Sequence, residues 1–175
     1  MSARVTLVLG GARSGKSALA ERLLLQAAGG QAPVYLATAQ AWDDEMRARI
    51  DQHRADRDGQ GWRTIEAPLD AAGALAALEP GVPVLIDCLT LWLSNHLLAE
   101  TDLPAESSRL IAAVCAHSGS VVAVANEVGL GIVPDNALAR RFRDAAGRLN
   151  QDLAARADRV VFVAAGLPMV LKGAL

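Results

Sequence analysis

Five short runs of consecutive apolar residues, rich in β-branched side chains, recur along the chain. Continuous apolar runs, unlike alternating ones, are typical of strands buried on both faces of a parallel sheet. Each run is bounded by Gly, Pro, Asp or Asn, which favour turns over strands. The pattern therefore predicts a mostly parallel sheet. Its predicted strands are Val5–Leu9, Pro33–Ala37, Val82–Ile86, Val121–Ala125 and Val160–Ala164.

The segments between these runs carry apolar residues at helical spacing. Four of them are predicted to be helices: Ser17–Ala28, Asp43–Arg57, Leu89–Ala99 and Ala105–Ala116. The first of these ends at two glycines, which is a helix-stop signal. Residues 58–61 and 129–136 are predicted to be loops.

The last helix has the clearest pattern. It follows the cap candidates Asp135 and Asn136, and Gly147 lies inside it at a cost of about 1 kcal/mol relative to Ala. Its apolar positions recur every three or four residues. They are Leu138, Phe142, Ala145, Leu149 and Leu153.

Strands that alternate with helices imply right-handed βαβ units, so we expect an α/β fold with helices flanking a central sheet. Ligands of such folds bind at the carboxyl ends of the strands. The length of 175 residues suits one domain, residues 1–175. Aromatic residues make up only 3%, whereas 35 residues are Ala, so the predicted core is aliphatic and closely packed.

Charge and cysteine content exclude several classes of protein. The net charge of −2 argues against a nucleic-acid partner, for which a basic excess is expected. Two cysteines, Cys88 and Cys115, cannot form a disulfide framework and suit a reducing compartment. We find neither a signal peptide nor a stretch approaching the ~20 apolar residues of a membrane helix. These observations predict a cytoplasmic protein without a membrane span.

The segment after the first predicted strand carries the strongest motif. Residues 10–17 read GGARSGKS and match G-x-x-x-x-G-K-[ST] at every fixed position. In this motif the glycines let backbone N–H groups turn toward phosphate oxygens, Lys16 reaches the β- and γ-phosphates, and the Ser17 hydroxyl binds Mg²⁺. The following helix directs its positive N-terminal end at the anion. The sequence therefore predicts a nucleoside triphosphate site. Its residues are Gly10, Gly11, Ala12, Arg13, Ser14, Gly15, Lys16 and Ser17.

A second element supports this site. The predicted strand before Asp87 is apolar and ends in that carboxylate, which is the usual metal-side partner of a phosphate-binding loop. The chain has only two lysines, Lys16 and Lys172, and lacks the Asn-Lys-x-Asp motif of regulatory GTPases. A regulatory GTPase is therefore disfavoured, although GTP stays possible as a substrate.

One histidine lies in an unusual setting. Glu45, Arg49, His53 and Arg57 follow one another at steps of four and share one face of the predicted helix. This pattern is compatible with a solvated charge stripe. It is also compatible with a nucleophile, because a neutral imidazole can attack phosphorus and nearby arginines can neutralise phosphate. By contrast, we interpret His96 and His117 as structural.

Several motifs together resemble one family. They are the loop at residues 10–17, YLATA at 35–39, DDEM…RI…HR between 43 and 54, WRTIE at 62–66, DCLT at 87–90, NEVG…GIVP at 126–134, FRD…G…NQ at 142–151, and AD at 157–158. The pattern, which runs from about Val5 to Lys172, resembles the bifunctional adenosylcobinamide kinase / adenosylcobinamide-phosphate guanylyltransferase of cobalamin biosynthesis.

The resemblance implies a P-loop NTPase of the RecA-like class and two reactions. In the first, ATP or GTP phosphorylates adenosylcobinamide. In the second, GMP passes from GTP through a guanylylated histidine to adenosylcobinamide phosphate, which yields adenosylcobinamide-GDP. It also implies Mg²⁺ and a homotrimer.

Site residues are carried over from the same resemblance. His53 takes the guanylylated position, and Asp87 joins Ser17 at the metal. Further nucleotide contacts are implied at Ala37, Thr38, Ala39, Arg54 and Glu66. Asn126 and Glu127 also end a predicted strand near the site, where a capping role and a catalytic role are equally open.

Two other interpretations remain. A plain small-molecule kinase would lack the guanylyl step. A RecA-like ATPase module would hydrolyse nucleotide in response to a macromolecule and ignore corrinoids.

Overall fold

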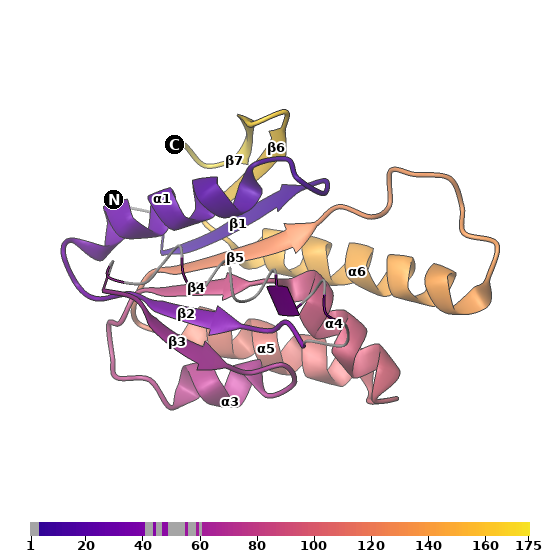
Figure 1. Ribbon diagram of the computed structural model, residues 1–175, viewed down its shortest axis with the longest axis horizontal. Helices are drawn as coiled ribbons and strands as arrows, with labels where there is room; N and C mark the ends of the chain where they lie inside the picture. Colours follow the sequence, from indigo (N-terminus) through magenta and orange to yellow (C-terminus); the bar gives the residue numbers. More distant parts are fainter. Residues whose placement is uncertain (1–3, 41–43, 45–46, 49–54, 56–58, 60) are drawn as a thin grey trace.

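A mixed sheet forms the centre of the computed structural model, which describes residues 4–40, 44, 47–48, 55, 59 and 61–175. Within these residues the sheet has seven strands in the order β3-β2-β4-β5-β1-β6-β7 (Figure 1). All neighbours pair in parallel except β6 and β7, which are antiparallel. The strands are β1 Val5–Gly10, β2 Val34–Ala37, β3 Arg63–Glu66, β4 Val84–Asp87, β5 Val121–Asn126, β6 Arg159–Ala164 and β7 Leu167–Lys172.

The helices cover the two faces of the sheet unequally. On one face α1 packs against strand residues such as Val8, Leu85 and Val124. The other helices lie on the opposite face, over a larger core that includes Leu7, Leu36 and Ile86 (Figure 1). The helices are α1 Lys16–Ala28, α3 Ala71–Ala76, α4 Leu89–Leu98, α5 Leu103–Ala116 and α6 Ala137–Arg156.

The five predicted strands are confirmed as β1, β2, β4, β5 and β6, within one or two residues at their ends. The continuous apolar patterning arises because each of these strands is paired on both sides and covered on both faces. The two strands that the pattern misses are the edge strands β3 and β7. β3 is mostly exposed and has a single apolar residue, Ile65. All six residues of β7 are exposed.

The sequence contains a turn signal between β6 and β7. Ala165 and Gly166 separate two apolar runs, and both have positive φ, of 51° and 76°. Two-residue hairpin loops favour this conformation, which matches the right-handed twist of the strands. The short helix α3 was also missed, because its six residues are too few to show a helical period.

Four of the five predicted helices are confirmed, with small shifts at their ends. α5 begins two residues earlier than expected because Asp102 caps it by accepting a hydrogen bond from the N–H of Ala105. Of the two cap candidates for α6, Asn136 is the cap, and its Oδ1 accepts from the N–H of Ala139. The predicted helix Asp43–Arg57 lies mostly outside the described residues. Asp44, Arg47, Ala48 and Ala55 are described, and each is helical.

Candidate functional site

The predicted site residues lie in a row at the carboxyl ends of five neighbouring strands. Glu66, Ala37 and Asp87 are in register across β3, β2 and β4. Further along the same edge, Asn126 of β5 pairs with Gly10 of β1. With strands ~4.8 Å apart, this edge provides a row of groups long enough to hold a nucleotide.

These side chains also share one face of the sheet. Side chains alternate along a strand, and Leu85 and Val124 belong to the core beneath α1. Asp87 and Asn126, each two residues further on, therefore face the side of α1. Gly10 follows the same rule after Val8. The polar ends of β4 and β5 thus lie on the face over which the phosphate-binding loop enters its helix.

The loop between β1 and α1 has the conformation that its motif predicts. Gly15 precedes α1 with a φ of 92°, a value that favours glycine, and no side chain caps the helix. The first N–H groups of α1 are thereby left for a ligand, as in anion sites at helix N-termini. Lys16 is buried, and its Nζ donates to the carbonyl of Gly11 at 3.0 Å within the loop. Ser17 follows as the second residue of the helix and is half-buried.

The β6–β7 hairpin supports this loop from outside. The N–H of Gly166 donates to the carbonyl of Ser14 at 2.8 Å. A Cβ added at Gly15 would lie 3.3 Å from the Cα of Gly166. A Cβ at Gly10 would lie only 2.7 Å from the carbonyl oxygen of Val163 in β6. Gly10 is thus required by neighbouring backbone, and Gly15 is favoured by its positive φ and by the close approach of Gly166.

Asp87 is held by a residue to which sequence reasoning assigned no role. The hydroxyl of Tyr35 on β2 donates to Oδ2 of Asp87 at 2.9 Å. The Tyr35 ring lies on the α1 face and meets Trp62 edge-on, with 6.2 Å between ring centroids. The bond occupies one carboxylate oxygen and fixes its orientation. The signal was the tyrosine two residues before the end of a buried strand, but only tertiary pairing places it beside Asp87.

A buried network joins the loops after β2, β3 and β4. The Thr38 hydroxyl donates to the carbonyl of Cys88 at 2.7 Å and accepts from its N–H at 2.8 Å. Nδ2 of Asn95 on α4 donates to the carbonyls of Thr38 and Pro68 at 2.8 and 2.9 Å. Thr38 is fully buried, so its side chain connects two strands in this structure. A nucleotide contact at Thr38 stays a prediction, and Asn95 was missed altogether.

The two cysteines are free. Burial, and next the nearby charge of Asp87, raise the pKa of the Cys88 thiol to about 11. Cys88 is therefore a protonated thiol at neutral pH, and its Sγ accepts from the N–H of Leu91 at the start of α4. This arrangement supports a structural role beside the site.

His53 and Arg54 lie outside the described residues, so the guanylylated position stays a prediction. Of the other implied contacts, Ala37 and Ala39 are half-buried and Glu66 is exposed at the end of β3. His96 and His117 are buried and hydrogen-bond backbone carbonyls through Nε2, as the structural interpretation expects.

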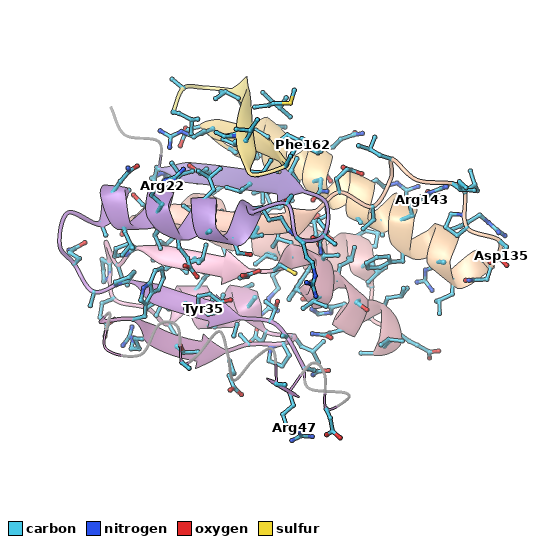
Figure 2. The ribbon with its side chains drawn as sticks, turned by 45° about the horizontal axis from the view of Figure 1, so that its top comes forward. Arg22, Tyr35, Arg47, Asp135, Arg143 and Phe162 are labelled. Carbon is cyan, nitrogen blue, oxygen red and sulfur yellow. The ribbon has the colours of Figure 1, made fainter. Side chains whose placement is uncertain are left out.

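The loop after β5 begins at the site and then leaves it. The N–H of Glu127 donates to the carbonyl of Gly10 at 3.1 Å, and Oε1 of Glu127 accepts from the N–H of Gly129. Glu127 therefore supports the turn that the sequence interpretation allowed. The loop then projects from the sheet to Asp135, at the outer end of α6 (Figures 1 and 2). It exposes Leu130 and Ile132.

Across the described residues, no helix is both long and apolar enough to cross a membrane.

The family model described as "Cobinamide kinase / cobinamide phosphate guanyltransferase" matches residues 6–171. The chain is 51% identical to the bifunctional adenosylcobalamin biosynthesis protein CobP of Pseudomonas aeruginosa, over 95% of this chain and 96% of that protein. It is 44% identical to the bifunctional adenosylcobalamin biosynthesis protein CobU of Salmonella typhimurium, over 95% of this chain and 98% of that protein.

Solved structures confirm the fold class. The flagellar accessory protein FlaH from Methanocaldococcus jannaschii matches with a TM-score of 0.54 and 13% identity, over 97% of this chain and 78% of that one. This likeness concerns the fold alone. The architecture is an α/β fold with a mostly parallel sheet flanked by helices.

Proposed function

The chain belongs to the cobinamide kinase / cobinamide phosphate guanyltransferase family and is an enzyme of cobalamin biosynthesis with both activities, and we propose that it transfers GMP through a covalent bond to His53. The proposal rests on the resemblance of the segment between residues 43 and 54 to the guanylylated segment of the family. One phosphate-binding loop, residues 10–17, at the end of the sheet favours a single nucleotide site for both reactions. A single unit, residues 1–175, then performs both reactions on adenosylcobinamide and its phosphate.

The first reaction is a phosphoryl transfer. The hydroxyl oxygen of the aminopropanol arm of adenosylcobinamide attacks the γ-phosphorus of ATP or GTP. The bond from that phosphorus to the β–γ bridging oxygen breaks, the nucleoside diphosphate leaves, and the hydroxyl proton is released. The loop N–H groups and Lys16 hold the phosphates and neutralise charge that develops on them, because such catalysis is mostly positioning and electrostatic stabilisation.

The second reaction occurs at the α-phosphorus of GTP. A ring nitrogen of His53 attacks it, the α–β bridging bond breaks, and pyrophosphate leaves. A phosphate oxygen of adenosylcobinamide phosphate then attacks the guanylyl phosphorus, the P–N bond breaks, and His53 is regenerated. Imidazole suits this role because it is both a nucleophile and a leaving group near neutral pH. Arg54, Ala37–Ala39 and Glu66 are proposed to contact the GTP.

Mg²⁺ fits the residues present. The available donors are a carboxylate at Asp87 and a hydroxyl at Ser17, and such hard oxygen ligands are those that Mg²⁺ prefers. Asp87 faces the side of the sheet on which α1 begins, and Tyr35 leaves its second oxygen for a ligand. When bound, Mg²⁺ would neutralise phosphate charge.

A homotrimer is also part of the proposal. Among the exposed apolar side chains are Leu130 and Ile132 in the loop before α6 and Leu167 and Met169 on β7. Exposed apolar clusters favour burial against another protein surface. Sedimentation analysis should give three times the 18.3 kDa of one chain; a monomer would contradict this part.

The histidine step is tested by labelling. Protein incubated with α-labelled GTP should retain label, and γ-labelled GTP should leave none. His53→Ala should abolish retention while phosphorylation of cobinamide continues. The control is His96→Ala, which removes a buried structural histidine and should keep the label. Full α-label on His53→Ala would exclude the assignment, and absence of label on the wild-type protein would favour a plain kinase.

A further inference from the structure

One polar atom beside the phosphate-binding loop has no hydrogen-bond partner. Oδ1 of Asn126 is buried, and no described residue bonds to it. Buried polar atoms in native proteins are nearly always bonded, so an unpartnered one at a binding site needs an explanation such as a ligand. Only three side-chain atoms in the described part of the chain share this condition, and Oγ of Ser14 is another.

The two unpartnered atoms near the site flank the same residue. Asn126 is the strand partner of Gly10. Oγ of Ser14 lies 2.5 Å from the position that a Cβ at Gly10 would occupy. Unpartnered side-chain atoms therefore gather where β1 becomes the phosphate-binding loop.

Two backbone hydrogen bonds hold the strand end at Asn126, and neither uses its carboxamide. The N–H of Asn126 donates to Oγ1 of Thr90 at 2.7 Å, and the next N–H, of Glu127, donates to the carbonyl of Gly10. The strand end is thus held between α4 and β1. A side chain on so rigid a support is suited to orienting a reactant.

Its position relative to the phosphates follows from the strand order. β5 lies between β1, which carries the loop, and β4, which carries Asp87. Asn126 shares the α1 face with Asp87 and is adjacent to the loop. Lys16 and the metal-side carboxylate define the β,γ end of a bound triphosphate. The carboxamide therefore faces the end of the nucleotide where phosphoryl transfer occurs.

The ligand of Oδ1 must be a hydrogen-bond donor or a metal ion, because an amide oxygen accepts hydrogen bonds and binds hard cations. Phosphate oxygens are acceptors and cannot fill this role. The phosphoryl transfer brings one donor to the γ-phosphate, the hydroxyl that becomes phosphorylated. We propose that Oδ1 of Asn126 accepts a hydrogen bond from this substrate hydroxyl and thereby turns the hydroxyl oxygen toward the γ-phosphorus. Asn126 orients the hydroxyl and does not take its proton, because an amide is not a base at neutral pH.

This inference rests on the proposed function. The two reactions distinguish an orienting role of Asn126 from a general role in nucleotide binding or folding. Guanylyl transfer uses a histidine nitrogen and then a phosphate oxygen, so it has no hydroxyl to orient. Loss of the Asn126 carboxamide should therefore slow phosphoryl transfer more than it slows guanylylation of the protein.

The experiment measures both rates on one preparation. Cobinamide phosphorylation is followed with γ-labelled GTP and self-guanylylation with α-labelled GTP, for the wild type, Asn126→Ala and Asn126→Leu. Leu has the same number and branching of side-chain heavy atoms as Asn and keeps the site filled. We expect the ratio of phosphorylation to guanylylation to fall about tenfold or more in both variants, since loss of an orienting hydrogen bond misplaces the nucleophile. The matched control is Asn136→Ala, which removes the cap of α6 and should leave the ratio unchanged.

Each other outcome overturns the proposal. Equal slowing of both reactions would assign Oδ1 to a metal-bound water or to folding, because both reactions share the nucleotide site. An unchanged ratio with unchanged rates would make the side chain dispensable. Failure of the proposed function is distinguishable, because the wild-type protein would then lack one of the two activities.

Discussion

The hydroxyl of Tyr35 and Oδ2 of Asp87 are joined by a hydrogen bond of 2.9 Å that connects β2 to the carboxylate at the end of β4. Tyr35 is itself buried, and its ring meets Trp62. Trp62 stands just before β3, at the end of the segment that holds His53. One side chain therefore links Asp87, the proposed metal-side carboxylate, with the residue that precedes β3.

We predict that Tyr35→Phe lowers the affinity for the Mg²⁺ that binds together with the nucleotide. The ring and its contact with Trp62 are kept, whereas the bond that orients Asp87 is lost. The Mg²⁺ concentration needed for half-maximal binding of a fluorescent GTP analogue should rise about three- to tenfold, the usual worth of one hydrogen bond. Binding without Mg²⁺ serves as the control and should not change. An identical Mg²⁺ titration would show that Asp87 needs no support from Tyr35.

Asn95 is predicted to position the loops that follow β2 and β3. Asn95→Ala leaves the carbonyls of Thr38 and Pro68 without their donor, and each unsatisfied group costs about 1–3 kcal/mol. Both the thermal midpoint and GTP affinity should fall.

The matched control for Asn95 is His117→Ala. It removes another buried bond to a carbonyl, that of Val82, at the opposite end of the sheet. This variant should lose stability but keep its GTP affinity. A parallel loss of affinity in both variants would mean that general destabilisation explains the Asn95 result.

The two glycines that open the phosphate-binding loop are predicted to differ in their tolerance of a side chain. A Cβ at Gly10 would meet backbone of β6 and the side chain of Ser14, whereas a Cβ at Gly11 would meet nothing within 4 Å. Gly10→Ala should therefore lower nucleotide affinity far more than Gly11→Ala. Equilibrium binding of a fluorescent nucleotide checks this order, and equal effects would contradict the steric explanation.

Gly147 is predicted to be replaceable by alanine with a gain in stability. It lies within α6, and an added Cβ would meet nothing within 4 Å. Alanine in a helix interior is favoured over glycine by up to about 1 kcal/mol. Chemical denaturation should show this gain. A loss of stability would reveal that the position contacts a second subunit.

The Cys88 thiol predicts a loss of stability at alkaline pH. Its pKa is 9.0 when unfolded and about 11 when folded. Above pH 9 the unfolded thiol therefore loses its proton while the folded one keeps it, so the stabilisation present below pH 9 declines as pH rises toward 11. The slope amounts to about 1.4 kcal/mol per pH unit. The difference in unfolding free energy between the wild type and Cys88→Ser, measured across this range, should decline with pH at that slope.

Much of the architecture was predictable from sequence because it depends on local patterns. The five strands β1, β2, β4, β5 and β6 have apolar runs that only burial on both faces explains, and α6 has an unbroken helical period. The loop at residues 10–17 was predictable because its glycines meet a local need of the backbone, which has a positive φ at Gly15, whereas the triphosphate site itself stays a prediction. The combined motifs also identified the family, which the comparisons confirm.

The remaining features depend on partners distant in sequence. The edge strands β3 and β7 have no distinctive pattern because they are largely exposed, and their pairing stabilises them.

Tyr35 acquires its role only because β2 lies beside β4, and Gly10 meets Val163 only because β6 lies beside β1. The sequence by itself determined the chemistry available at this site. The order of strands decided which groups meet there, because hydrogen bonds and steric contacts act over a few ångströms of space, whatever the separation along the chain.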